Sequence, residues 1–232
     1  MQIKALVTPP LDANCYIVSC EKTNAAVIID PGGNFRAIMD VISHCELSVK
    51  AIINTHGHVD HIGANGELKQ VTGAPLLISL ADAPMLPDPS GNLSAFFAEQ
   101  VRSPEADRLL LDGDCVAFGE ESLHVIATPG HTRGGLCLYS SSPAVGGAEL
   151  PGEGSAAGVG IGGTVAGVGV LFSGDTLFAG SIGRSDFPGG DSSELLASIK
   201  NKLLTLPDET IVYPGHGDTT TIGEERRFNP FL

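Results

Sequence analysis

The sequence is poor in basic residues. Lys and Arg together number 13 against 27 Asp and Glu, so the formal net charge at pH 7 is -14. A chain of that charge repels phosphate backbones and anionic membrane surfaces. We therefore expect neither a nucleic-acid partner nor a membrane partner, and a small-molecule substrate is favoured.

Cysteine pairs and targeting signals are also lacking. The number of cysteines is odd and none of them forms a Cys-x-x-Cys pair, which predicts reduced core thiols and no disulfide framework. They are Cys15, Cys20, Cys45, Cys115 and Cys137. Residues 1–5 lack the charged and apolar regions of a secretory signal, so a cytoplasmic location is expected. Residues 154–174 carry no charge, but they are too rich in glycine to predict a membrane span.

Glycine is concentrated in one segment, residues 141–169, where it fills ten of 29 positions. Such a segment cannot build a packed core and is typical of a flexible connection. The rest of the chain contains enough apolar residues for a sizeable core, 42% overall. We therefore predict a single domain over residues 1–232 with a flexible insertion at 141–169.

Apolar periodicity predicts alternating strands and helices. Residues 15–18 and 26–30 form a strand hairpin, and a helix over 35–45 followed by a strand over 50–54 makes a β-α-β unit. Further strands are predicted at 75–78, 115–118, 123–127, 135–139, 170–173 and 210–213. Further helices are predicted at 66–71, 95–101 and 192–204, the last capped at Asp191. Two groups of strands indicate two sheets.

The densest group of functional residues directly follows the strand at 50–54. Within Thr55–His61 lie His56, His58, Asp60 and His61. On a tight loop, the first two can converge on one cation while the last two reach a second cation about 3.5 Å away. Imidazole and carboxylate are ligands that zinc and iron accept.

Three further residues repeat the same arrangement of strand, glycine-bearing turn and ligand. His131 follows Thr128-Pro129-Gly130, Asp175 follows Phe172-Ser173-Gly174, and His216 follows Tyr213-Pro214-Gly215. The two other histidines, His44 and His124, lie in no such motif and are expected to be surface or packing residues.

In order and approximate spacing these motifs resemble the metallo-β-lactamase superfamily. The segments 180–188 and 214–220 and the 229–231 ending most resemble its short glyoxalase-II-like members. The resemblance implies an α/β fold, a four-layer αββα sandwich, with two divalent metal ions, most readily Zn²⁺, with Fe or Mn as alternatives. It assigns His56, His58 and His131 to one metal and Asp60, His61 and His216 to the other, with Asp175 as the bridge.

The implied activity is hydrolysis of a small acyl thioester such as S-lactoylglutathione, with a hydroxide that bridges the two metals as the nucleophile. Two cations lower the pKa of a bound water from 15.7 toward about 7. Asp60 is expected to orient this nucleophile as well as to bind metal. Arg184 is expected either to receive a substrate carboxylate or to pair with Asp186 and hold its loop.

Other functions stay open at this point. Mononuclear iron persulfide dioxygenases share the first His motif and a Gly-Arg-(Ser/Thr)-Asp-Phe segment, and their iron would use His56, His131 and Asp175. The chain also ends sixteen residues after His216, where full-length glyoxalase II continues into a helical domain that binds glutathione. A β-lactamase role is disfavoured by the missing export signal. A nuclease role is disfavoured by the negative charge, and a non-catalytic binding role is disfavoured by the complete ligand set.

Overall fold

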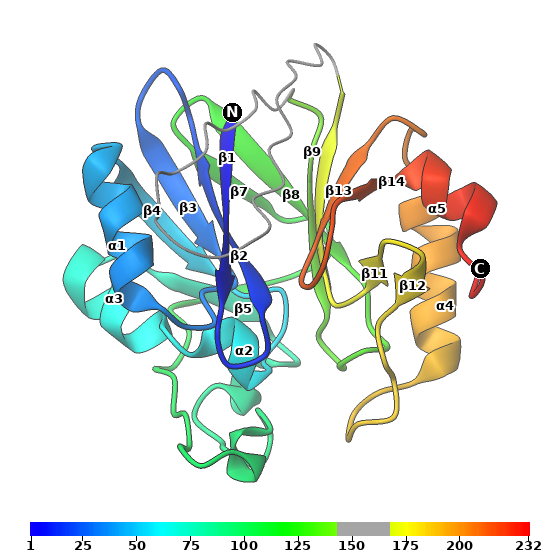
Figure 1. The fold of residues 1–232 in the computed structure, drawn as a ribbon, viewed down its shortest axis with the longest axis horizontal. Coiled ribbons are helices and arrows are strands. Elements are labelled where there is room, and N and C mark those ends of the chain that lie inside the picture. Colours follow the sequence, from blue (N-terminus) through cyan, green and yellow to red (C-terminus); the bar gives the residue numbers. More distant parts are fainter. Residues whose placement is uncertain (143–167) are drawn as a thin grey trace.

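Two six-stranded sheets, packed face to face, form the centre of a computed structural model that describes residues 1–142 and 168–232 (Figure 1). The first sheet has the strand order β1-β2-β3-β4-β5-β6. These strands span Gln2–Thr8, Ala13–Ser19, Ala25–Ile29, Ser48–Ile53, Leu76–Ser79 and Arg108–Leu110. The predicted hairpin is β2 and β3, which pair antiparallel, and the predicted β-α-β unit joins β3 to the parallel β4.

The second sheet has the strand order β14-β13-β10-β9-β8-β7, and β11 pairs with β12 in a small separate ribbon. In chain order from β7 to β14 these strands span Cys115–Phe118, Glu121–Ala127, Leu136–Ser140, Val170–Gly174, Leu177–Phe178, Ser181–Ile182, Ile211–Pro214 and Thr220–Thr221. Strands β10 and β13 are parallel and adjacent, so their carboxyl ends meet at the same edge of the sheet.

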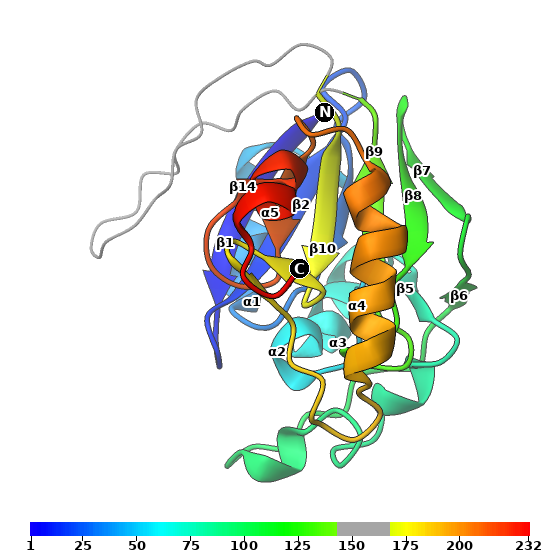
Figure 2. The same cartoon turned by 90° about the vertical axis from the view of Figure 1, so that its right-hand side faces the viewer.

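Helices cover the outer face of each sheet (Figures 1 and 2). The α-helices α1 to α5 span Phe35–His44, Val59–Ile62, Asn65–Thr72, Ser192–Asn201 and Ile222–Phe228. Three short 3₁₀ turns, η1 to η3, span Ala83–Met85, Ser94–Phe96 and Leu203–Thr205. The Asp191 side chain accepts hydrogen bonds from the backbone N–H groups of Ser193 and Glu194, which confirms the predicted cap of α4.

Three separate apolar clusters show that the molecule has four layers. Alternate side chains of a strand point to opposite faces of its sheet, so in β2 Ile17 packs toward the helices while Tyr16 packs between the sheets. Ile38 of α1 belongs to the first outer cluster, and Leu195 of α4 belongs to the cluster on the far side of the second sheet. The predicted αββα order is therefore confirmed.

Several predicted elements differ from the observed ones. The helix expected at 95–101 is absent apart from the turn at Ser94–Phe96, because side chains take up the backbone hydrogen bonds of Val101. The Val101 N–H donates to Ser94 Oγ, and its carbonyl accepts from Asn92 Nδ2. The helix expected to reach residue 204 ends at Asn201. The patterns also missed β1, β6, β11, β12, β14, α2 and α5. Strands β6, β11, β12 and β14 have only two or three residues and α2 is a single turn, so these elements are too short to show a period.

The prediction that the cysteines are core thiols is correct for three of the five. All five are free, and Cys15, Cys20 and Cys137 are buried. Cys45 is half-buried after the last turn of α1, and Cys115 is exposed because β7 directs Val116 and Phe118 inward and its other side chains to solvent. The insertion expected at 141–169 lies outside the described residues except at its two ends.

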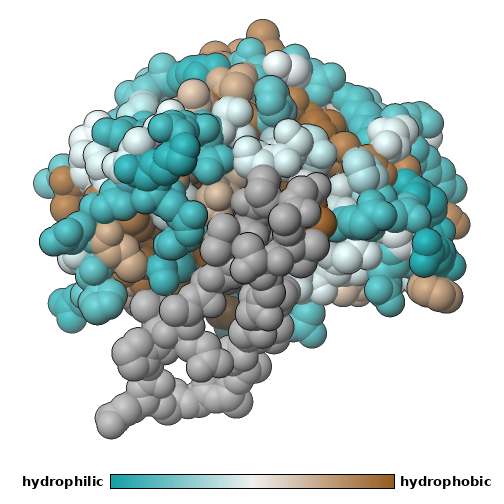
Figure 3. Space-filling model, turned by 90° about the horizontal axis from the view of Figure 1, so that it is seen from above, coloured by the Kyte–Doolittle hydropathy of each residue, from teal (hydrophilic) through white to brown (hydrophobic). Residues whose placement is uncertain are grey.

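Seen from above, the described surface shows apolar residues interspersed with hydrophilic ones (Figure 3). Within residues 1–142 and 168–232 no helix has the length and apolar character needed to cross a membrane.

Candidate metal centre

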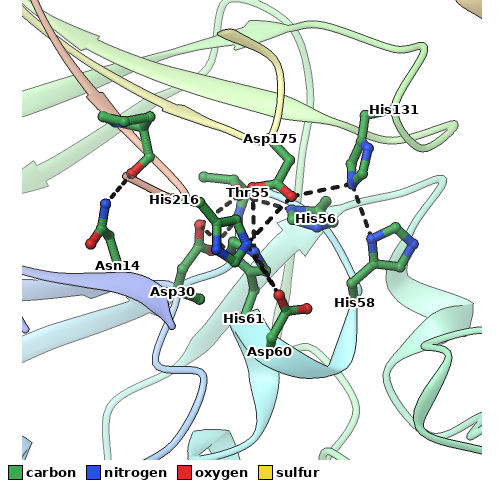
Figure 4. Close-up of polar contacts among 12 residues, drawn as sticks. Asn14, Asp30, Thr55, His56, His58, Asp60, His61, His131, Asp175 and His216 are labelled. Carbon is green, nitrogen blue, oxygen red and sulfur yellow. Dashed lines mark hydrogen bonds and ion pairs between the residues drawn. The ribbon is translucent and has the colours of Figure 1, made fainter. Parts of the chain in front are cut away.

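The predicted ligands converge at the ends of strands from both sheets (Figure 4). His56 and His58 follow β4, and Asp60 and His61 lie in α2 directly after them. The other three come from the second sheet: His131 follows β8, Asp175 follows β10 and His216 follows β13. All seven therefore meet in one place.

Their donor atoms have the spacing of a coordination shell. His58 Nδ1 and His131 Nε2 are 3.0 Å apart, and His216 Nε2 and Asp60 Oδ2 are 3.2 Å apart. His61 Nε2 lies 3.4 Å from Asp175 Oδ1. Donors bound at about 2.0–2.1 Å to one tetrahedral ion are separated by about 3.3 Å. Three groups have all donor atoms within 4.8 Å of one another: His56, His58 and His131; His56, His61 and Asp175; and Asp60, His61 and His216.

Hydrogen bonds fix which nitrogen of two imidazoles is free to bind an ion. His131 Nδ1 lies 2.7 Å from the Arg184 carbonyl oxygen, which can only accept, so this nitrogen carries the proton. The Thr55 hydroxyl donates to an Asp30 carboxylate oxygen at 2.6 Å, so it accepts from His56 Nδ1 at 3.2 Å. In both rings Nε2 is left with a free lone pair that points into the centre.

Asp30 is a supporting residue that the sequence analysis did not single out. It is buried at the end of β3, and it accepts hydrogen bonds from the backbone N–H and the hydroxyl of Thr55 at 2.7 and 2.6 Å. Its Oδ2 is also 3.1 Å from His61 Nδ1, so it turns Nε2 of that ring toward the other ligands. A carboxylate behind a ligand histidine is a frequent feature of metal sites. Its position directly after an apolar strand was the available signal.

A second supporting contact holds the loop of His216. Asn14 of β2 donates from Nδ2 to the carbonyls of Pro214 and Gly217 at 3.0 and 2.9 Å, and Tyr16 OH donates to the Pro214 carbonyl at 2.6 Å. These contacts join residues about 200 positions apart in sequence. No local pattern could have revealed them.

Buried atoms without partners test whether a metal fits here. His56 Nε2, His61 Nε2 and Asp175 Oδ1 are buried and have no hydrogen-bond partner. Buried polar atoms are normally satisfied, and these three lie in the second of the donor groups. A cation would satisfy all of them, so the site of His and Asp residues suits divalent metal ions.

The electrostatics of the side chains differ between the two ends of the cluster. Burial, together with the neighbouring imidazoles, lowers the pKa of His56 well below its usual value and that of His58 to about 3. Burial also disfavours the charged form of His61, but Asp175, Asp60 and Asp30 outweigh it and raise the pKa of His61 to about 10. One end of the cluster thus consists of neutral imidazoles, while at the other end the carboxylates favour the protonated form of His61, whose proton a bound cation would replace.

The Arg184 loop lies beside this centre. The Arg184 guanidinium makes two hydrogen bonds of 2.8 Å to the Asp186 carboxylate, so the predicted ion pair is confirmed. The same guanidinium lies 3.8 Å above the Phe187 ring, whose centroid is 5.9 Å from that of His58. The Arg184 side chain is 55% exposed, which leaves it open to solvent near the ligands. His44 and His124 are exposed and lie outside the donor groups, as expected.

Comparison with protein families gives a match over most of the chain. The model of the metallo-beta-lactamase superfamily matches residues 8–145 and 143–216. The chain is 37% identical over 231 residues to a protein of Aquifex aeolicus, with 100% of this chain and 97% of the relative covered. It is 35% identical to the hydroxyacylglutathione hydrolase GloC of Haemophilus influenzae, with 100% and 98% covered. It is 33% identical to the probable metallo-hydrolase YqgX of Bacillus subtilis, with the same coverage.

Solved structures agree with this family match. The BLEG-1 B3 metallo-beta-lactamase superposes with a TM-score of 0.84 at 35% identity, covering 100% of this chain and 99% of the other. TTHA1623 in a di-iron-bound form gives 0.77 at 32% identity, with 99% and 100% covered. ETHE1 from Myxococcus xanthus gives 0.72 at 29% identity, with 99% and 84% covered.

Proposed function

The chain belongs to the metallo-beta-lactamase superfamily, and we propose that within it the protein is a dinuclear metal hydrolase of small acyl thioesters related to S-lactoylglutathione. The observation that carries the proposal is that Asp175 lies within reach of two three-ligand groups, since its Oδ2 is 3.6 Å from His131 Nε2 and 3.7 Å from His216 Nε2. The likeness to GloC supports the thioester class.

In this proposal each group of ligands holds one divalent ion. His56, His58 and His131 would hold the first ion and Asp60, His61 and His216 would hold the second, with Asp175 available to both. Zn²⁺ is the preferred ion, and the di-iron-bound relative supports iron as an alternative. Two divalent ions bound there would lower the pKa of a coordinated water toward neutral pH and would polarise the acyl carbonyl.

Two residues of the chain act beside the metals. Asp60 Oδ2 lies between the imidazoles of His61 and His216, at 3.6 and 3.2 Å, so its second oxygen can accept a hydrogen bond from the attacking water and orient it. Arg184 pairs with Asp186 at the edge of the centre. Its outward donors can receive a carboxylate of the substrate. A thiolate leaves readily, so the reaction requires no separate general acid.

Two other functions are kept as alternatives because particular relatives favour them. The likeness to ETHE1 gives weight to the mononuclear iron persulfide dioxygenase. The likeness to BLEG-1 gives weight to β-lactam hydrolysis.

The test is elemental analysis of the purified protein, run beside three assays: hydrolysis of S-lactoylglutathione, oxygen uptake with glutathione persulfide, and hydrolysis of a chromogenic cephalosporin. We expect about two metals per chain and thioester turnover. His58→Ala should remove one metal and the activity, whereas His44→Ala, at an exposed histidine outside the donor groups, should change neither. One iron per chain with oxygen uptake would overturn the proposal in favour of the dioxygenase.

A further inference from the structure

Asp82 is a buried carboxylate beside the metal centre that belongs to none of the three donor groups. It lies just after β5, the strand next to β4, and its exposed fraction is 0%. Its own backbone N–H donates to Ser79 Oγ at 3.1 Å, and its carbonyl accepts from the Met85 N–H at 2.9 Å. The turn that carries it is therefore fixed to the end of the first sheet.

The carboxylate of Asp82 joins the two loops that carry facing histidines. Its Oδ2 accepts from the Gly57 N–H at 3.2 Å and from Thr132 Oγ1 at 2.7 Å. Its Oδ1 accepts from the Gly134 N–H at 2.7 Å. Gly57 lies between His56 and His58, and Thr132 directly follows His131.

Close packing leaves little freedom between these segments. A Cβ atom at Gly134 would lie 2.0 Å from Ser79 Oγ and 2.7 Å from Asp82 Oδ1. A Cβ at Gly57 would lie 2.7 Å from the Cβ of Met85, three residues after Asp82. Both loops therefore pack against the same turn, the loop of Gly57 from the first sheet and the loop of Gly134 from the second.

We propose that Asp82 is a positioning residue that sets the distance between His58 and His131, and so the affinity of the metal site that they share with His56. The proposal rests on the proposed two-metal function. Its reason is geometric: metal–ligand distances tolerate deviations of about 0.2 Å, while His58 Nδ1 and His131 Nε2 are held 3.0 Å apart from opposite sheets. Hydrogen bonds to an ionised acceptor are about twice as strong as neutral ones. Three of them converge on this one side chain.

The substitution that tests this role is Asp82→Asn, which keeps the shape of the side chain. An amide offers a single acceptor oxygen, and its NH₂ group would face one of the backbone N–H donors, so the bond to Gly57 or to Gly134 is lost. The matched control is Asp107→Asn. Asp107 also accepts a backbone N–H, that of Leu76 at 2.7 Å, but it contacts no ligand loop.

The measurement is Zn²⁺ affinity of the metal-free proteins by chelator competition, with the visible spectrum of bound Co²⁺ to count the sites. We expect wild type and Asp107→Asn to bind two ions equally well. For Asp82→Asn we expect one ion to bind about tenfold to hundredfold more weakly. The other ion should bind unchanged, because Asp30 supports His61 independently.

The outcomes distinguish failure of the proposed role of Asp82 from failure of the proposed two-metal function. Unchanged affinity at both sites in Asp82→Asn would overturn the proposal while leaving the two-metal function intact, and so would equal weakening of both sites. Absence of a second ion in the wild type would instead overturn the proposed function. If Asp82→Asn does not fold, Thr132→Val removes only the hydroxyl donor, and it should weaken the same single site by a smaller factor.

Discussion

Replacing Gly215 by alanine should empty the metal centre without unfolding the protein. Gly215 precedes His216, and a Cβ atom there would lie 2.2 Å from Asp175 Oδ1 and 2.9 Å from His61 Cε1. Real Cβ contacts essentially never fall below 3.0 Å. Either Gly215 or Asp175 must therefore shift by about 0.8 Å. This is several times the roughly 0.2 Å that metal–ligand distances tolerate.

The loop of Gly215 is held on both sides, so Asp175 is the partner that moves. The Gly215 N–H donates to the Gly174 carbonyl at 2.8 Å, and its carbonyl accepts from the Asn14 N–H at 2.7 Å. We therefore expect the Asp175 side chain, which is 12% exposed, to rotate away from the added methyl group. We expect metal affinity to fall at least about hundredfold, or about 2.8 kcal/mol, and thioester turnover to fall with it.

The assay is the Zn²⁺ content of protein equilibrated in a series of chelator-buffered metal concentrations, together with the melting temperature of the metal-free form. The control is Gly217→Ala, where the added Cβ meets nothing within 4 Å and only the φ of 74° is unfavourable. That variant should lose about 1–2 kcal/mol of stability and keep its metals. Wild-type affinity in Gly215→Ala would refute the reasoning, since it would mean that Asp175 is not needed as a ligand.

Three further predictions concern the supporting residues and the metals. Asp30→Asn removes the carboxylate behind His61, and Zn²⁺ titration should show about tenfold to hundredfold weaker binding; unchanged binding would contradict this role. Removing the metals with a chelator should lower the melting temperature by about 5–10 °C, since a ligand at a hundredfold excess over its Kd stabilises the folded protein by about 2.7 kcal/mol. Adding Zn²⁺ back should restore the melting temperature. Arg184→Met should raise KM for a carboxylate-bearing thioester about tenfold, with little change in melting temperature because its ion pair is exposed. The control Arg36→Met, at an exposed arginine on α1, should leave KM unchanged. Equal KM values in the two variants would assign Arg184 a purely structural role.

The sequence by itself determined the order of the main elements and the identity of the ligand candidates. Strands such as β3, β4 and β10 are short apolar runs closed by turns, and ligands placed directly after a strand must lie at a sheet edge. This is why His56, His131, Asp175 and His216 could be selected from local patterns. The same patterns failed at 95–101, where side chain to backbone hydrogen bonds replaced a helix.

Only the tertiary structure decided which residues support the ligands. Asp30, Asp82 and Asn14 each act on a segment 25 to about 200 positions away in the chain, and no local pattern shows which segment that is. Whether a carboxylate orients a histidine depends on distances of about 3 Å between strands, which follow from how the two sheets pack. The sequence therefore supplied the ligand candidates, and the packing of the two sheets fixed their spacing.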